Sequence, residues 1–392
     1  MKKINIVLII LISMLFSESA MIFDHSSIDI TTITQDEVQR AKDYLHIAYG
    51  HTSHGSQITD GMNGLVGFAN GGGKGLAFPT DFFDWNNGGT DGALDLMEGD
   101  GYGDGPLDHD CGYYPSWVDE TSEYLNDVNN SDVNVIMWSW CGQISYKGDQ
   151  RLIDEYLGPM TQFENDYPDI TFVYMTGHSD GGGEEGSVHI NNQQIRDYCI
   201  ENKKVLLDFY DIECYDPDGN YYGDKYVTDN CDYDSNGDGS TDKNWATEWQ
   251  NSHTENVDWY NCGSAHSQPL NANQKAYAVW KMFAEIAKMY DPNLTIEPQD
   301  EEEIIHKFKL HKCYPNPFNP ATNIKISLPK QSDISIKVFD VMGKQVAELF
   351  SGNINAGIHG FQFDGSGFPS GIYFYKLQSN NFSAIEKMVL LK

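Results

Sequence analysis

The stretch YLHIAYGHTSHGSQITDGM (residues 44–62) decides the fold, because a short apolar run stops at Gly50 and gives way to polar residues. A helix-like segment at 36–45 precedes the run. The run itself is typical of a strand buried on both faces of a sheet. The order of helix, strand and polar loop places that loop at the carboxyl edge of the sheet, the usual ligand edge of an open α/β fold. We therefore expect the loop to carry function.

Three further apolar runs look like buried strands, and helix-like segments alternate with them. The predicted strands are VNVIMWSW (133–140), ITFVYMTG (170–177) and KVLLDFYDI (204–212). The predicted helices are 116–128, 151–166, 191–203 and 271–290. This alternation predicts a parallel sheet covered by helices on both faces. Two long polar insertions, 68–115 and 215–261, interrupt it and are expected to be ordered or functional, because structureless loops of that length are uncommon.

The charge of the chain is strongly negative and unevenly spread. Its 392 residues carry a formal net charge of −33, which argues against nucleic acid or an anionic membrane as partner, because both would be repelled. Residues 21–303 hold 13 basic and 52 acidic side chains, whereas residues 304–392 hold 10 and 5. This asymmetry predicts two domains, and the polar, proline-punctuated segment 292–303 is the predicted linker.

Residues 1–20 have the pattern of a signal peptide. Lys2 and Lys3 precede an apolar run from Ile4 to Phe16, and small residues follow. The run is too short to cross a bilayer, and no later segment is apolar for ~18 residues, so no membrane span is expected. The seven cysteines are therefore expected to meet an oxidising compartment and to form disulfides. Six of them lie in the acidic domain, and the choice among their 15 possible pairings stays open.

Residues 304–392 alternate apolar and polar side chains between turn residues, which predicts a small sandwich of about seven strands. The segments YPNPFNPATNIKISLP (314–329), IKVFDVMGKQV (336–346), SGIYFYKL (370–377) and the terminal KMVLLK resemble the type A sorting domain of the bacterial type IX secretion system. This resemblance implies an Ig-like domain that engages the secretion machinery and takes a periplasmic cargo across the outer membrane. It implies a secreted or cell-surface location. An ordinary Ig-like binding module is the alternative.

Ser53 and His266 are the candidate catalytic pair. Ser53 lies on the predicted turn between strand and helix, where a nucleophile is exposed, and His266 lies in the loop before the last helix. This order, together with the block GHTSHG (50–55), resembles the SGNH (GDSL-like) hydrolase superfamily. The resemblance implies a flavodoxin-like three-layer α/β/α domain over residues 21–291 with esterase activity. The alternative is that both residues serve only as turn, cap or hydrogen-bonding residues.

The same resemblance points to an oxyanion site and exposes one departure. The predicted strand 133–140 leads into Gly142 and Gln143, where the family has an oxyanion-hole Asn, and a Gln amide donates the same type of hydrogen bond. The family also has an Asp three residues before the His, and Gly263 stands at this position. We expect Asp258 or a backbone carbonyl to orient His266, or else a Ser–His dyad.

Other chemistry is possible at the same edge of the sheet. Imidazoles gathered over this edge would form a zinc site, and the candidate ligands are His51, His54, His178 and His189. The spacing of His51 and His54 is a weak signal, because no carboxylate partner is placed beside them. Cys141 is a weaker candidate nucleophile, because other cysteines of an exported chain are available to pair with it.

The acidic insertion contains the run DYDSNGDGSTD (232–242), which has the register of an EF-hand-like calcium loop with Gly at the sixth position. The predicted ligands are Asp234, Asn236, Asp238, Ser240 and Asp242. The twelfth position is Trp245 rather than Glu, as in short repeats of extracellular proteins. We expect a structural Ca²⁺ of modest affinity that orders the insertion and holds the His266 loop. A solvated acidic turn is the alternative.

The sequence thus predicts a secreted serine esterase that removes an acyl group from an extracellular ester, with a polysaccharide as the expected substrate class. One alternative is a non-catalytic, calcium-dependent carbohydrate-binding or surface protein built on a hydrolase-like fold. A zinc-dependent hydrolase is the other.

Overall fold

The computed structural model describes residues 19–99, 106–294, 308–311, 313, 316, 318–355, 357–379 and 382–391. Two compact units divide the chain, one ending at Leu294 and the other beginning at Thr295. All but the last two residues of the predicted signal peptide (1–20) lie outside the described residues, as does most of the predicted linker (292–303). No helix in the described ranges is both long and apolar enough to cross a membrane.

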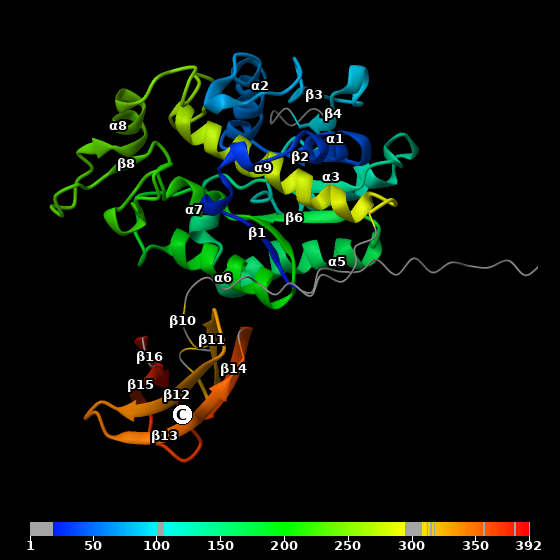
Figure 1. Ribbon diagram of the computed structural model, residues 1–392. Coiled ribbons are helices and arrows are strands. Elements are labelled where there is room, and N and C mark those ends of the chain that lie inside the picture. Colours follow the sequence, from blue (N-terminus) through cyan, green and yellow to red (C-terminus); the bar gives the residue numbers. More distant parts are fainter. Residues whose placement is uncertain are drawn as a thin grey trace, which may run out of the picture. The chain divides into compact units, whose positions relative to one another are not determined.

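A parallel sheet of seven strands forms the centre of the first unit (Figure 1). Its strands are β1 (Met21–Phe23), β2 (His46–Gly50), β3 (Trp85–Asn86), β4 (Leu94–Glu98), β5 (Val135–Trp138), β6 (Thr171–Met175) and β7 (Val205–Leu207). Their order across the sheet is β1-β7-β6-β5-β2-β4-β3, and each neighbouring pair is parallel. All of β5 is buried, as expected for a central strand of consecutive apolar residues.

Helices cover both faces of this sheet (Figure 1). On one face lie α1 (Gln35–Tyr44), α2 (Ser56–Asn70) and α9 (Pro269–Tyr290). On the other lie α3 (Ser116–Asn126), α4 (Asp149–Leu152), α5 (Gly158–Asp166) and α6 (Ser187–Glu201), with a π-helical turn between α4 and α5. Trp117 of α3 packs against both Trp138 and Phe163, which ties its helix to β5 and α5. This architecture confirms the predicted α/β class.

Two differences from the predicted elements have local causes. The predicted strand 204–212 ends early: β7 stops at Leu207, and Asp208 caps the short helix α7 (Phe209–Glu213) by accepting a hydrogen bond from the Asp211 backbone N–H. The stretch 68–115 is not wholly an insertion, because it supplies β3 and β4 to the sheet. Those strands are short and flanked by Gly and Asp, which hides their pattern in the sequence.

The helices α2 and α9 pack with their backbones in close contact. A Cβ atom added at Gly61 of α2 would lie 2.2 Å from the carbonyl oxygen of Ala272 in α9, so any larger residue would force the two helices apart. The loop that follows β2 leads into α2, and the loop that contains His266 leads into α9. This helix packing therefore brings the two loops of the candidate catalytic pair together.

The acidic insertion (215–261) is ordered around aromatic side chains. It contains β8 (Asp232–Tyr233), β9 (Lys243–Asn244) and α8 (Trp245–Ser252). Tyr233 and Trp245 are buried, and both rings pack against Tyr222 with centroid distances of 4.7 and 5.9 Å. Apolar contacts thus order part of the insertion, and they offset some of the repulsion among its carboxylates.

The second unit consists of antiparallel strands in two sheets that share one apolar core. The strands are β10 (Lys309–Leu310), β11 (Ala321–Leu328), β12 (Ser332–Asp340), β13 (Gln345–Ile354), β14 (Gly357–Asp364), β15 (Gly371–Ser379) and β16 (Ser383–Leu390). One sheet has the order β10-β11-β14 and the other β13-β12-β15-β16. The predicted all-β character is confirmed among the described residues.

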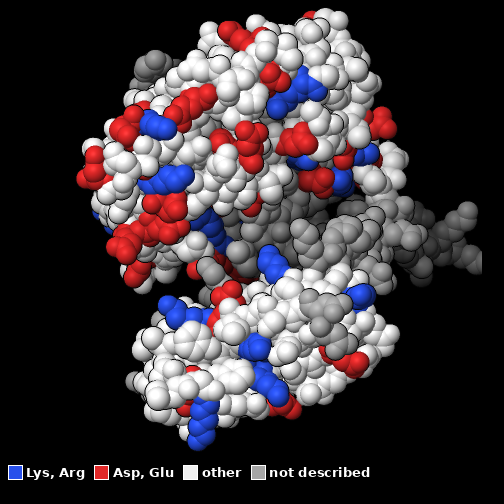
Figure 2. Space-filling view, turned by 60° about the vertical axis from the view of Figure 1, so that its left-hand side comes forward, with Lys and Arg blue, Asp and Glu red and all other residues white. Residues whose placement is uncertain are grey.

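Figure 2 shows the acidic side chains of the first unit gathered in several red groups on one face.

Candidate active site

The central strands carry their polar loops at one edge of the sheet. The neighbouring strands β2, β5 and β6 are parallel, so the residues that follow Gly50, Trp138 and Met175 meet at their carboxyl ends. Ser53, Cys141 and Gly142, and His178 lie in these three loops. The prediction that the first loop faces the ligand edge of the sheet agrees with this topology.

Ser53 and His266 are in direct contact although 213 positions separate them. The Ser53 Oγ lies 3.0 Å from Nε2 of His266, and both residues are exposed. The Gln57 side chain anchors the histidine loop, because its amide donates to the Ala265 carbonyl at 2.5 Å. His266 has a φ of 63°, a left-handed conformation that costs free energy for a non-glycine residue and is often found at functional sites.

The second nitrogen of His266 has no carboxylate hydrogen-bonded to it among the residues that the structure describes. Asp258 does not take that role, because it accepts a hydrogen bond from the Thr254 backbone N–H at 2.8 Å in an exposed turn. At Gly263, the Asp60 carboxylate occupies the space, since an added Cβ would lie 2.7 Å from it. Asp229, from the acidic insertion, has an oxygen within 4.8 Å of a His266 nitrogen. It is the carboxylate that the sequence did not reveal.

The loops 52–54 and 141–143 are connected at both ends, at one end through Asp110 and at the other by direct contact. At one end, Asp110 Oδ2 accepts hydrogen bonds from the Thr52 hydroxyl at 2.7 Å and the Gln143 amide at 3.2 Å. At the other end, His54 Nδ1 lies 3.1 Å from the Cys141 sulfur. Ser53 and Gly142 lie between these two connections, and the backbone N–H of each has no partner in the described part of the chain.

The Gln143 side chain has a different environment from the one predicted. Its Nε2 donates to Asp110, and its Oε1 accepts from the Cys141 backbone N–H at 3.2 Å. Both ends of the amide are therefore occupied within the protein, which suits it to hold the loop rather than to contact a substrate. Burial raises the pKa of Asp110, although Thr52, Gly112 and Gln143 all donate hydrogen bonds to it.

Three imidazole rings form a continuous stack beside Ser53. The ring of His54 lies between those of His178 and His266, with centroid distances of 3.8 and 4.4 Å. Burial lowers the pKa of His54 and outweighs the opposing effect of Asp229, whose Oδ2 lies 3.1 Å from its Nε2. Partial burial acts to raise the pKa of Asp229, but the hydrogen bonds from His54 and Asn230 and the nearby imidazoles together outweigh it, and the pKa is lowered. His54 is thus neutral and Asp229 ionised near pH 7.

Of the four predicted zinc ligands, only His54 and His178 come together. Both nitrogens of His51 are engaged, one 2.9 Å from a Glu98 oxygen and the other 2.9 Å from the Thr52 carbonyl. The His189 ring packs on Tyr210 instead, at a centroid distance of 5.6 Å. His51 and His189 are therefore not part of the cluster.

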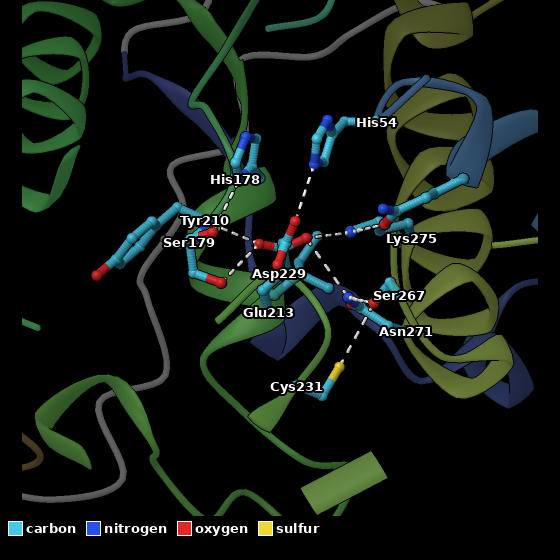
Figure 3. Close-up of polar contacts among 12 residues, drawn as sticks. His54, His178, Ser179, Tyr210, Glu213, Asp229, Cys231, Ser267, Asn271 and Lys275 are labelled. Carbon is cyan, nitrogen blue, oxygen red and sulfur yellow. Dashed lines mark hydrogen bonds and ion pairs between the residues drawn. The ribbon is translucent and has the colours of Figure 1, made fainter. Parts of the chain in front are cut away.

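A buried ion pair is linked by hydrogen bonds to the loop that carries His178 (Figure 3). The Lys275 ammonium of α9 lies 2.6 Å from a Glu213 carboxylate oxygen, and both side chains are fully buried. The other Glu213 oxygen accepts hydrogen bonds from the backbone N–H and the hydroxyl of Ser179, beside His178. Lys275 also contacts the Gln57 amide oxygen, and burial lowers its pKa. One network therefore connects α2, α9 and the His178 loop.

The predicted calcium loop is held by hydrogen bonds within itself. The Asp234 carboxylate accepts from the backbone N–H groups of Gly237 and Gly239 at 2.7 and 2.8 Å. Asp238 accepts from the Ser240 backbone and hydroxyl, and Asp242 accepts from the Ser235 backbone and hydroxyl. The bond from Gly239 lowers the pKa of Asp234, and the one from the Ser240 side chain lowers that of Asp238. The lowered pKa values favour the ionised form of Asp234 and Asp238, the form that binds Ca²⁺.

All seven cysteines are free thiols, so the expected disulfides are absent. Several thiols are engaged singly: Cys111 donates to the Ser139 carbonyl at 3.0 Å, and Cys231 lies 3.5 Å from the Ser267 hydroxyl. Cys141 differs from them because its neighbour is an imidazole nitrogen.

Comparison with known proteins identifies the second unit. Residues 312–391 match the family model of the secretion system C-terminal sorting domain. The tail is a sorting domain. It implies that the protein is secreted or displayed at the cell surface and that it interacts with the type IX secretion machinery. This confirms the resemblance seen in the tail sequence.

The first unit has no such counterpart. The family match does not extend to it, and no curated protein matches the chain. Similar solved structures include latent PorU (15% identity, 21% of this chain, 9% of that chain, TM-score 0.19) and PorZ (16% identity, 24% and 13%, TM-score 0.17), both from Porphyromonas gingivalis. A Cellulomonas fimi endo-β-1,4-mannanase covers 91% of this chain and 80% of its own at 11% identity and a TM-score of 0.22. The chain spans only about a tenth of PorU and PorZ, and TM-scores this low carry no functional inference.

Proposed function

We propose that the first unit is a secreted serine hydrolase of SGNH type that cleaves an ester. The observation that carries the proposal is the 3.0 Å contact between the exposed Ser53 hydroxyl and His266 Nε2. A nucleophile and a base within hydrogen-bond reach at the ligand edge of a parallel sheet are the minimum that acyl transfer needs. The sorting tail accounts for export and leaves the chemistry to this unit.

In this mechanism, the Ser53 hydroxyl donates its proton to Nε2 of His266 as its oxygen attacks the ester carbonyl. The histidine then returns the proton to the leaving alcohol, and a water molecule repeats the sequence to release the acid. The Asp229 carboxylate, within 4.8 Å of a His266 nitrogen, favours the imidazolium that forms in between. Asp229 thus supplies the charge that the family places at the position of Gly263.

The oxyanion that develops on the ester carbonyl needs hydrogen-bond donors. The unpartnered backbone N–H groups of Ser53 and Gly142 lie on the facing loops and suit this role. One such donor contributes ~10²–10³ in rate. Gln143, predicted as a donor, takes the role of positioning residue because Asp110 and Cys141 already hold its amide.

The substrate class rests on export and on the resemblance to esterases: we propose an acylated extracellular polysaccharide. We also propose that Ca²⁺ binds the loop formed by Asp234, Asn236, Asp238, Ser240 and Asp242. The loop belongs to the same insertion as Asp229, so an ion there would hold that carboxylate in place beside the histidines.

The test is covalent labelling of the secreted, full-length chain with a fluorophosphonate, followed by intact-mass measurement and peptide mapping. We expect a single adduct on Ser53, absent from Ser53→Ala. Ser56→Ala is the matched control, because this serine, the first residue of α2, lies three positions from Ser53 and its hydroxyl donates to the Ser53 carbonyl at 2.9 Å. It should label like the wild type.

Hydrolysis of p-nitrophenyl acetate and release of acetate from acetylated polysaccharides then measure turnover. Absence of both the adduct and turnover from a folded protein would overturn the hydrolase proposal and favour the carbohydrate-binding alternative, which glycan binding by the same sample would test.

A further inference from the structure

His54, Cys141 and His178 bring three metal-ligating side chains together from three separate loops. One ligand atom of each lies within 4.8 Å of the other two. The histidine residues are 6% and 8% exposed, so their rings are shielded from bulk water. Nitrogen and sulfur donors at these separations are the ordinary ligands of zinc and related ions in proteins.

The hydrogen bonds of the two histidines leave one nitrogen of each free for a ligand. The Nε2 of His54 lies 3.1 Å from the Asp229 carboxylate, which leaves its Nδ1 to face the Cys141 sulfur at 3.1 Å. The Nδ1 of His178 donates to the Ser179 carbonyl at 2.7 Å. Carboxylates and backbone carbonyls that hold the second nitrogen are the usual outer partners of metal-binding histidines.

The remaining nitrogen of His178 gives the strongest indication of a ligand site. Its Nε2 is buried and has no hydrogen-bond partner. An unsatisfied buried polar atom costs about 1–3 kcal/mol, so such an atom calls for an explanation. It faces Gly142, the residue after Cys141, because a Cβ added at Gly142 would lie 3.9 Å from it.

We propose that His54 Nδ1, the Cys141 thiolate and His178 Nε2 bind a transition-metal ion of the zinc class. The rings of His54 and His178 are parallel in the structure, with 4° between their planes, so one ring turns about its Cβ–Cγ bond for both lone pairs to meet one ion. Three protein ligands leave a fourth position of a tetrahedral ion to water or substrate. Soft sulfur and nitrogen donors exclude Ca²⁺, which the acidic loop suits instead.

The test is metal analysis of the full-length protein after equilibration with Zn²⁺ and gel filtration. We expect ~1 zinc per chain in addition to any calcium. Cobalt should produce the ultraviolet charge-transfer band of a cobalt–thiolate bond and the visible bands of a tetrahedral ion. Cys141→Ser should remove the thiolate band, and His178→Ala should lower the zinc content. Asp229→Asn should weaken zinc binding by ~10–100-fold while leaving the bands in place.

The matched controls are Cys262→Ser and His189→Ala, which change the same residue types outside the cluster. Both should keep full zinc content. Equal zinc content in wild type, Cys141→Ser and His178→Ala would overturn the proposal, as would cobalt bands without a thiolate contribution. Tight copper binding with an intense thiolate band in place of zinc would support the same ligand set with a different ion.

Fluorophosphonate labelling separates this inference from the proposed function. Labelling of Ser53 in a protein that binds no zinc would overturn the metal site alone. Zinc binding through Cys141 without labelling would overturn the serine mechanism alone and would favour a metal-dependent hydrolase.

Discussion

The loops around Ser53 and the acidic loop at 234–242 are both polar and rich in titratable groups, yet their side chains are satisfied in opposite ways. In the acidic loop, each aspartate accepts hydrogen bonds from residues a few positions away. Around Ser53, the contacts of His54 with Cys141 and of Ser53 with His266 join residues 87 and 213 positions apart, and a buried nitrogen of His178 has no hydrogen-bond partner. Local satisfaction indicates a structural role, whereas long-range contact with unused donors and acceptors indicates chemistry.

The largest expected effect is that of Ser53→Ala on ester hydrolysis. We expect a loss of about 10³-fold or more, because the variant removes the nucleophile and leaves only binding and oxyanion stabilisation. The melting temperature should stay within about 1 °C of the wild type, since Ser53 is exposed. Steady-state kinetics measure this, with Ser56→Ala as control. Unchanged turnover in Ser53→Ala would show that the loops around Ser53 do not carry the chemistry.

The second effect concerns the ion pair beneath the histidines. Lys275→Met leaves the Glu213 carboxylate buried without its cation, so we expect a loss of ~3–5 kcal/mol in the free energy of unfolding. Urea unfolding of the full chain, followed by the fluorescence of the first unit, measures it. Lys281→Met on the same helix should cost under ~1 kcal/mol, because Lys281 donates to the Thr32 hydroxyl at an exposed position. Equal losses of unfolding free energy in the two variants would show that the Lys275–Glu213 ion pair does not stabilise the fold more than an exposed lysine does.

The third prediction tests the acidic loop. Affinities of ~10⁻⁴–10⁻³ M are usual for extracellular calcium modules, so about 10 mM Ca²⁺ should add ~1.4–2.7 kcal/mol of stability. This corresponds to a rise of about 3–8 °C in melting temperature relative to EDTA. Asp238→Ala should abolish the rise, and the exposed Asp91→Ala should not. A melting curve that ignores calcium would mean that the loop is only a solvated turn.

The smallest expected effect is on a histidine–carboxylate pair outside the stack. The hydrogen bond with Asp211 raises the pKa of His25 above its ordinary value. A raised folded-state pKa stabilises the protein below about pH 6.5, and this stabilisation is lost as the pH rises through the folded-state value. We expect at most ~1 kcal/mol, because the His25 ring is about one-third exposed. Unfolding at several pH values should show this slope, and His25→Gln should flatten it.

The sequence predicts the buried strands well, because β2, β5 and β6 are short runs of consecutive apolar residues, which are stable only when both faces of the strand are buried. The position of Ser53 after the first strand is a local signal, whereas its pairing with His266 is expected only from the resemblance to SGNH hydrolases. Asp229 gives no such signal: it is one of 11 carboxylates in the acidic insertion, and only tertiary folding selects it. The contact of Cys141 with His54 is hidden for the same reason, because it joins two loops from different strands.

Gly61 gives a handle for protein engineering. The two helices that it allows to touch begin just after the nucleophile loop and just after the base loop. A larger side chain there would push α9 away from α2 and lengthen the distance between Ser53 and His266 without altering either residue. A graded series at this one position, from Gly61→Ala to Gly61→Val, would thus show how turnover depends on the distance between the serine hydroxyl and its histidine base.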